Sequence, residues 1–246
     1  MELRMAIWNV VPIVRTPEGA GAVVSRLMPT PHLRHLDPFV VFDDFSVQAP
    51  AGFPDHPHRG FEAVTWMLEG AFHHRDNLGN DSVVHAGGAQ RFTAGRGLVH
   101  SEMPWGEQPA RGIQLWINLP RALKGIEPDY QALDQAPCAI VDRVTMRHVV
   151  GHPGAIRLHT PVHWTDLSFD QPGAIDAPLP DPPSTVICYP LSGRFRIAGH
   201  EIEPGLALAG QQVESATIDC TAPGRILCIS GVPHNEPIRQ WGPYVD

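Results

Sequence analysis

Two short motifs in the first half of the chain constrain its fold more than any other feature. His56 and His58 stand two residues apart, and so do His100 and Glu102. Side chains two apart on a β-strand point to the same face of a sheet. Two strands that each present such a pair inward would bring three imidazoles and one carboxylate around one point. That donor set suits a transition metal and leaves coordination positions open.

Each motif is weak evidence by itself. The chain contains 14 histidines, so one His-x-His pair is an expected coincidence, and the second pair is weak for the same reason. The combination is stronger because strand and turn signals fill the segment between the pairs, which could therefore lie on neighbouring strands of one small barrel. The alternative is that these histidines are surface residues or hydrogen-bonded loop residues.

Short apolar runs separated by turn residues predict an all-β fold. The chain has 23 glycines and 26 prolines without a low-complexity repeat, which indicates many tight turns between short strands. Residues 1–20 are predicted to be irregular, and residues 48–57 a loop. Because Pro57 lacks an N–H, the first histidine pair should lie at a strand start or at a sheet edge. In the first half we expect strands at Val23–Leu27, Phe39–Phe42, Ala63–Leu68, Phe72–Asp76, Ser82–His85, Gln90–Thr93, Leu98–Met103 and Ile113–Leu119.

The second half repeats this pattern after a polar segment, Arg121–Tyr130, which is predicted to be a linker with one helical turn. Asp170–Pro183 is rich in proline and is predicted to be a loop. The strands expected here are Val144–Val150, Ile156–Leu158, Val186–Tyr189, Arg194–Ile197, Ala207–Leu208, Thr217–Ile218 and Ile226–Ser230.

A faint internal repeat indicates a duplicated barrel. Leu68-Glu69-Gly70 matches Leu191-Ser192-Gly193, and Gly87-Gly88 matches Pro204-Gly205. We therefore divide the chain into a metal-binding domain at 1–130 and a second domain at 131–246, whose tail could pack back on the first. The positions of the second half that correspond to the two motifs carry no ligand set, so the second domain is expected to be free of metal.

Composition excludes several classes of function. The net charge is −8 and no basic cluster is visible, which argues against direct binding to nucleic acid. We find neither a signal peptide nor an apolar span of membrane-crossing length, and so expect no membrane contact and a cytoplasmic location. Four cysteines, Cys138, Cys188, Cys220 and Cys228, form no C-x-x-C motif and are expected to be reduced core thiols. The alternative, a redox-sensitive thiol, has no activating neighbour in the sequence.

The two motifs lie in longer segments that resemble a known family. His56–Glu62 reads HPHRGFE and Thr93–Pro104 reads TAGRGLVHSEMP, and both look like signature segments of the pirin family within the cupin superfamily. The resemblance covers nearly the whole chain. It extends to Leu36–Phe39, Phe42–Phe45, Asn235–Ile238 and Gly242–Val245.

This resemblance implies two β-barrel cupin domains, a bicupin. It also implies a metal, usually Fe(II), bound by His56, His58, His100 and Glu102, although Ni, Cu, Zn or Mn could take its place. Several family members have quercetin 2,3-dioxygenase-like activity, which implies a small hydroxylated aromatic substrate and O₂. Animal members act as nuclear coregulators of transcription, so the alternative is a metal- or redox-dependent regulator that binds a protein partner.

Glu102 is the candidate with two roles. We expect it to be a metal ligand in the resting state, and we hypothesise that it also acts as the catalytic base toward a substrate hydroxyl. Glu62 lies where germin-like cupins place a glutamate ligand. The pirin pattern assigns that role to Glu102, so Glu62 is left out of the ligand set.

Other residues near the motifs have a structural and a functional interpretation. Arg59 could orient an anionic substrate or form a local salt bridge. Phe53, Phe61, Trp66 and Trp116 could line an aromatic slot or belong to the core. His73, His74 and His85 are expected to face solvent or to support the ligands from behind. Gly95 and Gly97 should allow a tight turn before His100.

Overall fold

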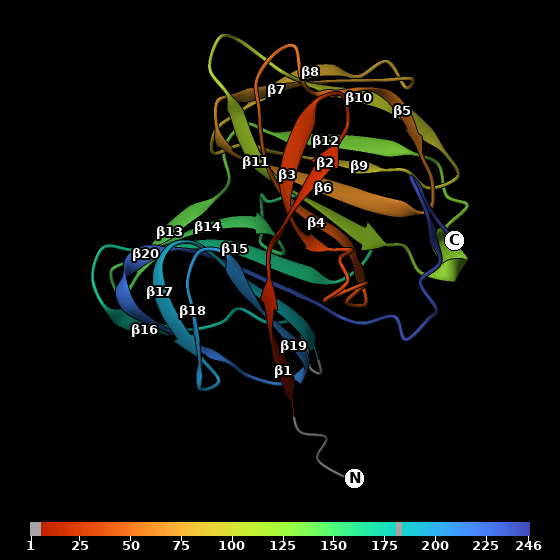
Figure 1. Ribbon diagram of the computed structural model, residues 1–246. Helices are drawn as coiled ribbons and strands as arrows, with labels where there is room; N and C mark the ends of the chain where they lie inside the picture. Colours follow the sequence, from red (N-terminus) through yellow and green to blue (C-terminus); the bar gives the residue numbers. More distant parts are fainter. Residues whose placement is uncertain (1–5, 181–183) are drawn as a thin grey trace. The chain divides into compact units, whose positions relative to one another are not determined.

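The computed structural model describes residues 6–180 and 184–246, and it is built almost entirely of antiparallel strands (Figure 1). It comprises two compact units. The N-terminal unit contains Val14–Ala136 and His234–Asp246, and the C-terminal unit contains the described residues among Met1–Ile13 and Pro137–Pro233. The all-β class expected from the sequence is confirmed. The domain boundary at residue 130 stays a prediction. In the structure, residues 131–136 and 234–246 belong to the N-terminal unit.

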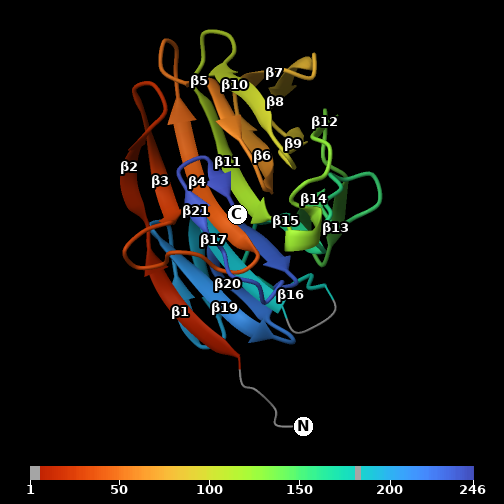
Figure 2. The same ribbon diagram turned by 90° about the vertical axis from the view of Figure 1, so that its right-hand side faces the viewer.

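Two sheets form the body of the N-terminal unit (Figure 2). The larger has the order β12-β9-β6-β11-β4-β3-β2 and the smaller the order β5-β10-β7-β8. The strands of the larger sheet are β2 (Val14–Glu18), β3 (Ala22–Met28), β4 (Phe39–Val47), β6 (Phe61–Glu69), β9 (Ala89–Thr93), β11 (Ala110–Asn118) and β12 (Asp129–Leu133). Those of the smaller are β5 (Phe53–His58), β7 (Ala71–Asp76), β8 (Asp81–His85) and β10 (Leu98–Pro104). A 3₁₀ turn, η1 (Arg121–Leu123), and a short hairpin of β21 (Gln240–Trp241) and β22 (Tyr244–Val245) complete the unit.

The central strands of the larger sheet are buried on both faces. On β11 the apolar residues Ile113, Leu115 and Ile117 alternate as the sequence predicts and are all fully buried. The opposite face of the same strand carries Gln114 and Trp116, which take part in the site described below. The pleat therefore divides β11 between the core and the site.

The C-terminal unit contains one nine-stranded sheet with the main order β1-β19-β17-β20-β15-β14-β13. Its strands are β1 (Ile7–Pro12), β13 (Cys138–Val141), β14 (Val144–Val150), β15 (Val162–Phe169), β16 (Gly173–Asp176), β17 (Ser184–Ile197), β18 (His200–Ile202), β19 (Leu206–Val213) and β20 (Thr217–Gly231). Buried apolar side chains such as Phe195, Leu208 and Ile226 form one core cluster here, together with Cys188 and Cys228. Cys188, Cys220 and Cys228 are buried free thiols as expected, whereas Cys138 is exposed.

Several predicted element boundaries are wrong, chiefly at sheet edges. Residues 1–20 contain β1 and β2, and the predicted loop at 48–57 ends in β5. Edge strands such as β2 and β5 tolerate polar residues and prolines, because one side of their backbone forms no hydrogen bonds to a neighbouring strand. They therefore lack the apolar pattern by which strands are predicted. The edge position expected for the first histidine pair is confirmed, since β5 is the outer strand of its sheet.

The second half departs from prediction in similar ways. The runs predicted at 186–189 and 194–197 belong to one continuous strand, β17, and 217–218 and 226–230 both belong to β20. Strand β15 was not predicted, and β16 lies inside the predicted loop at 170–183, of which residues 181–183 are outside the described part. Ile156–Leu158 contributes only an isolated bridge. Within residues 6–180 and 184–246, no helix has the length and apolarity needed to cross a membrane. The cytoplasmic location stays a prediction.

Candidate metal centre

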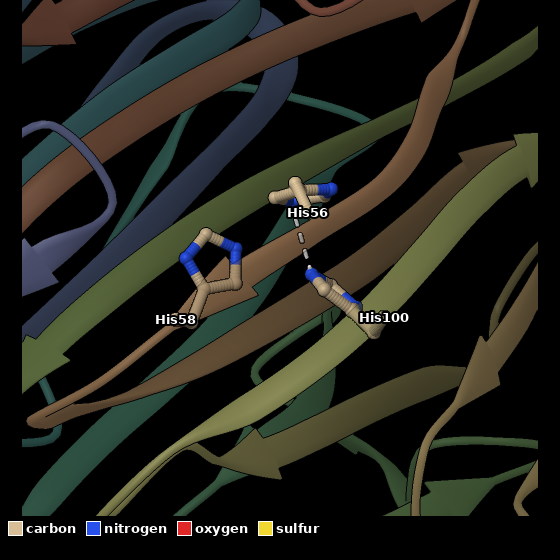
Figure 3. Close-up of side chains that lie close together, drawn as sticks. All are labelled: His56, His58 and His100. Carbon is tan, nitrogen blue, oxygen red and sulfur yellow. Dashed lines mark hydrogen bonds between the residues drawn. The ribbon is translucent and has the colours of Figure 1, made fainter.

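Strands β5 and β10 bring the two sequence motifs together. They pair antiparallel with His100 directly opposite His56, and the ring nitrogens His100 Nε2 and His56 Nε2 lie 3.1 Å apart (Figure 3). His58 stands two residues along β5 on the same face, and one nitrogen from each of the three rings lies within 4.8 Å of the others. The structure thus gathers the three predicted histidine ligands.

Backbone carbonyls hold the far side of two of these rings. His56 Nδ1 lies 2.7 Å from the carbonyl oxygen of Pro54, and His58 Nδ1 lies 3.2 Å from that of Pro243. A carbonyl oxygen only accepts, so each Nδ1 carries the proton and donates it. The Nε2 atoms are then left with free lone pairs, which is the arrangement typical of metal-binding histidines.

Burial keeps the rings of His58 and His100 neutral. Desolvation, followed by the neighbouring His56, lowers the pKa of His58 to about 3, although the Pro243 carbonyl opposes the shift. The pKa of His100 is also lowered well below its usual value, first by burial and then by His58, His56 and His74. A metal binds the neutral imidazole, so both shifts favour the form that a ligand needs.

Glu102 points between the two sheets, where three strands of the larger sheet supply donors to it. Thr65 Oγ1 and Gln90 Nε2 donate to Oε1 at 3.0 and 2.5 Å, and Gln114 Nε2 donates to Oε2 at 2.7 Å. The backbone register shifts between His100 and Glu102. Glu102, His74 and His100 form a second group of side chains that could hold a metal ion. This group shares His100 with the three-histidine group. The four predicted ligands therefore lie in two overlapping groups rather than one.

His74 is the functional candidate that sequence reasoning undervalued. Of its two interpretations, the solvent-facing one is wrong, because its side chain is fully buried, and the supporting one agrees with its position next to His100. His73 is partly buried and His85 is exposed. The signal was present, since His74 and Asp76 form a third pair two residues apart at the end of a predicted strand. It was overlooked because the adjacent His73 obscured the alternation.

The remaining candidates take mostly structural roles. Arg59 forms a salt bridge with Asp246 at 2.9 Å and lies over the ring of Tyr244, so the local salt-bridge interpretation holds. Glu62 is buried and accepts a hydrogen bond from Thr93 Oγ1 at 2.8 Å. Phe61 and Trp66 are fully buried in the core, whereas Phe53 and Trp116 line a cavity. Gly95 and Gly97 have φ of 49° and 153°, in keeping with a tight turn before β10.

A cavity of about 520 Å³ opens beside His56 and His58. Its aromatic walls are Phe45, Phe53 and Trp116, and its polar walls include the Arg26–Asp43 ion pair, Glu18, Asp55 and Gln114. This volume is within the range of small-molecule sites. Three carboxylates against one guanidinium make the walls acidic, so they favour a neutral ligand over a carboxylate.

The C-terminal segment Gln240–Asp246 closes one side of this cavity, and we call it the strap. It supplies Pro243, whose carbonyl receives the His58 N–H. Lys124 Nζ fastens the strap by donating to Val245 O at 2.8 Å and to Gly60 O at 2.9 Å. The Val245 backbone N–H also donates to Arg59 O at 3.0 Å. The strap is thus tied to the turn that follows the first histidine pair.

Known proteins resemble this chain over nearly its full length. The Pirin family model matches residues 21–117. A pirin-like protein of Solanum lycopersicum is 40% identical over 239 residues, which cover 93% of this chain and 82% of that protein. The human protein named Pirin is 39% identical over 241 residues, covering 93% and 83%. The chain belongs to the pirin family.

A further relative and two solved structures are also similar to this pirin. A Pseudomonas aeruginosa protein named "Putative quercetin 2,3-dioxygenase" is 38% identical over 93% of this chain and 87% of its own length. A crystal structure of quercetin 2,3-dioxygenase from Acinetobacter baumannii superimposes with a TM-score of 0.85 at 25% identity, covering 97% of this chain and 83% of that one. A bacterial pirin from Escherichia coli, solved in complex with nickel(II), gives a TM-score of 0.78 at 20% identity, covering 92% and 99%. These neighbours establish the bicupin fold of the cupin superfamily.

Proposed function

We propose that this pirin is a metal-dependent dioxygenase that cleaves a flavonol or a related hydroxylated aromatic, with His56, His58, His100 and Glu102 as the metal ligands. The observation that supports it most is the convergence of three imidazoles, of which His58 and His100 are buried, beside a cavity of about 520 Å³. The Nδ1 protons of His56 and His58 are engaged by carbonyls. The names of the Pseudomonas relative and the Acinetobacter structure support the reaction class.

The donor set suits Fe(II) as the working metal. Imidazoles accept iron, nickel, copper and zinc, and a carboxylate favours the harder, redox-active members of this series. When bound, a redox-active metal would supply the electron transfer that the reaction of O₂ with a closed-shell aromatic requires. The nickel found with the Escherichia coli pirin is compatible with the same ligands, because affinity for such sites rises from iron to nickel.

The chain's own residues would bind and orient the substrate. Phe53 and Trp116 offer faces to a flat ring, and Gln114 and the Arg26–Asp43 pair offer hydrogen bonds to hydroxyl groups. Glu102 does not itself line the cavity, but Gln90 and Gln114 hold its carboxylate in place, and we assign it the role of base toward a substrate hydroxyl. Residues of the strap line one side of this cavity.

Oxygen uptake by anaerobically iron-loaded protein given quercetin tests the proposal. We expect uptake coupled to loss of quercetin in the intact protein, and none in the His58→Ala/His100→Ala variant. A His148→Ala/His152→Ala variant is the matched control, because it removes a stacked histidine pair from the C-terminal unit and leaves the site intact. A benzoate analogue should be a poorer ligand than a neutral phenol.

Two results would contradict the proposal. Uptake that persists in the His58→Ala/His100→Ala variant would place the chemistry elsewhere. Absence of uptake in intact protein with iron shown to be bound would reject the flavonol substrate. The second result would favour a metal-dependent regulator that binds a protein partner.

A further inference from the structure

Behind His100, on the side away from His56, lies a buried histidine–aspartate pair on strand β7. His74 Nδ1 is 3.5 Å from His100 Nδ1, and His74 Nε2 is 3.1 Å from Asp76 Oδ2. The side chains of His74 and Asp76 are both completely inaccessible to solvent. The register explains the placement, because β7 pairs with β10 so that Asp76 lies opposite His100 and His74 opposite Glu102.

The neighbours of Asp76 determine which atoms carry protons. Its Oδ1 accepts the backbone N–H groups of Leu78 and Asn80, and its Oδ2 accepts from Asn80 Nδ2 at 2.8 Å. A carboxylate oxygen held in this way accepts from His74, so the His74 proton is on Nε2. With His74 neutral, its Nδ1 is an acceptor, and the group it faces, His100 Nδ1, carries a proton.

This chain of hydrogen bonds leaves His100 Nε2 without a proton. The neutral ring of His56 also lacks a proton on Nε2, because its Nδ1–H donates a hydrogen bond to the Pro54 carbonyl oxygen. With the protons placed in this way, the two Nε2 lone pairs face each other at 3.1 Å, a contact that is a hydrogen bond only when one of these nitrogens carries a proton. Two facing lone pairs repel unless a cation lies near both, so the arrangement is one that a bound metal ion stabilises.

We propose that the Asp76–His74 pair is a positioning device that fixes His100 in the Nδ1–H tautomer and so presents Nε2 to the metal. This inference rests on the proposed metal site. Backbone carbonyls do the same for His56 and His58, whereas His100 depends on side chains. Asp76 and His74 are positioning residues, since neither touches the reacting atoms in the proposed reaction.

Tyr130 holds the pair in place from the larger sheet. Its ring stacks on His74 with centroids 4.3 Å apart and planes at 19°. Its hydroxyl donates to Gln90 Oε1 at 2.9 Å, which leaves Gln90 Nε2 to donate to Glu102. The orientations of His74 and of the Glu102 donor Gln90 are therefore set by the same tyrosine.

The test reads the tautomer of His100 directly. Long-range ¹H–¹⁵N correlation spectra of the metal-free, ¹⁵N-labelled protein distinguish a protonated ring nitrogen from a bare one. We expect Nδ1–H at His100 in the intact protein. In Asp76→Asn the amide keeps an oxygen for the backbone donors but presents N–H to His74 Nε2. The proton of His74 should then move to Nδ1, where it donates to His100 Nδ1. His100 should therefore carry its own proton on Nε2.

Metal affinity should follow the tautomer. Titration with Zn(II) against a competing chelator should show about 10–100-fold weaker binding for Asp76→Asn. His74→Phe preserves the stacking on Tyr130 but removes the acceptor, so it should lose affinity similarly. His74→Gln offers an oxygen to His100 and should recover most of that loss. This pair keeps the inference testable if Asp76→Asn fails to fold.

Asp81→Asn is the matched control. It alters a histidine–aspartate pair on the same hairpin, in which His73 Nε2 lies 2.7 Å from Asp81 Oδ1, but that pair contacts none of the proposed ligands. It should change neither the tautomer nor the affinity. The spectra need no metal, so the two proposals can fail separately. If the protein binds no metal but Asp76→Asn still changes the His100 tautomer, the metal proposal fails and this inference holds. An unchanged His100 tautomer in Asp76→Asn, or a second metal ion bound through His74 Nδ1, would overturn it.

Discussion

The carboxylate of Glu102 is restrained by three side-chain hydrogen bonds. Donors from β6, β9 and β11 converge on its two oxygens, so one side chain of the smaller sheet joins three strands of the larger. Each of these bonds fixes its direction relative to His100. The residue therefore combines a structural role between the sheets with its proposed role at the metal.

Glu102→Gln tests both roles. The new amide group would oppose either Gln90 or Gln114, which are both donors, and such a mismatch should cost about 1–3 kcal/mol of unfolding free energy. Metal affinity should fall by about tenfold or more, and turnover should be lost. Chemical denaturation and chelator competition measure the two effects. A variant that keeps both its metal and full turnover would contradict the base hypothesis.

The buried neutral histidines predict how stability depends on pH. The pKa of His58 in the folded protein is about 3, below the 6.5 of an exposed histidine, and that of His100 is lowered too. Below pH 6.5, His58 and His100 therefore bind protons in the unfolded chain but stay unprotonated in the folded protein. The metal-free protein should lose about 1.4 kcal/mol of unfolding free energy per pH unit for each histidine.

Denaturation of metal-free protein between pH 7 and 5 measures this slope. His58→Phe should reduce the slope by about the contribution of one histidine. His85→Phe, at an exposed position on β8, is the comparison. A slope that His58→Phe leaves unchanged would mean that His58 is protonated in the folded state.

Among the elements, the strap predicts a coupling between the C-terminus and the metal ligands. Gly60 has a φ of 86°, and a Cβ at that position would lie 1.8 Å from the carbonyl oxygen of Val245. Gly60→Ala should therefore displace the strap and remove the Pro243 acceptor from His58. We expect about 10–100-fold weaker metal binding.

Lys124→Met is the complementary change, because it keeps the aliphatic stem but removes the donor to the Gly60 and Val245 carbonyls. It should cost about 1–3 kcal/mol of unfolding free energy and weaken metal binding. Gly125→Ala, where a Cβ meets nothing within 4 Å, is the control for Gly60→Ala. Unchanged metal affinity in both Gly60→Ala and Lys124→Met would show that the strap does not orient His58.

The elements also show what a sequence can predict. Strands such as β6, β9 and β11 were found because burial imposes an apolar pattern on them. Strand β5 was missed because it contains Pro54 and Pro57, which usually indicate a loop. An edge strand tolerates these prolines because it pairs with a neighbouring strand on one side only. The pairing of His56 with His100 follows from strand register, a long-range property that no local pattern encodes. The supporting carbonyl of Pro243 lies 185 residues from His58 in the chain, so it was beyond any local motif.

At the scale of the whole molecule, the proposed metal chemistry belongs to one unit. Among the described residues, both groups of side chains that could hold a metal ion lie in the N-terminal unit, whereas Phe195 belongs to an apolar core cluster of the C-terminal unit. Phe195→Ala should therefore cost about 3–5 kcal/mol of unfolding free energy by leaving a cavity in that cluster. Thermal denaturation together with metal titration of the folded variant checks this, and loss of metal binding at a temperature where the variant is folded would contradict the division of roles.

The central claim is that His56, His58, His100 and Glu102 bind one metal ion per chain, and metal stoichiometry tests it most directly. Metal-free protein is reconstituted anaerobically with Fe(II), passed through a desalting column and analysed for iron and protein. We predict about one iron per chain for the intact protein and for the His148→Ala/His152→Ala control. The His56→Ala/His58→Ala/His100→Ala variant should retain almost none. Full retention of iron by a folded triple variant would contradict the account.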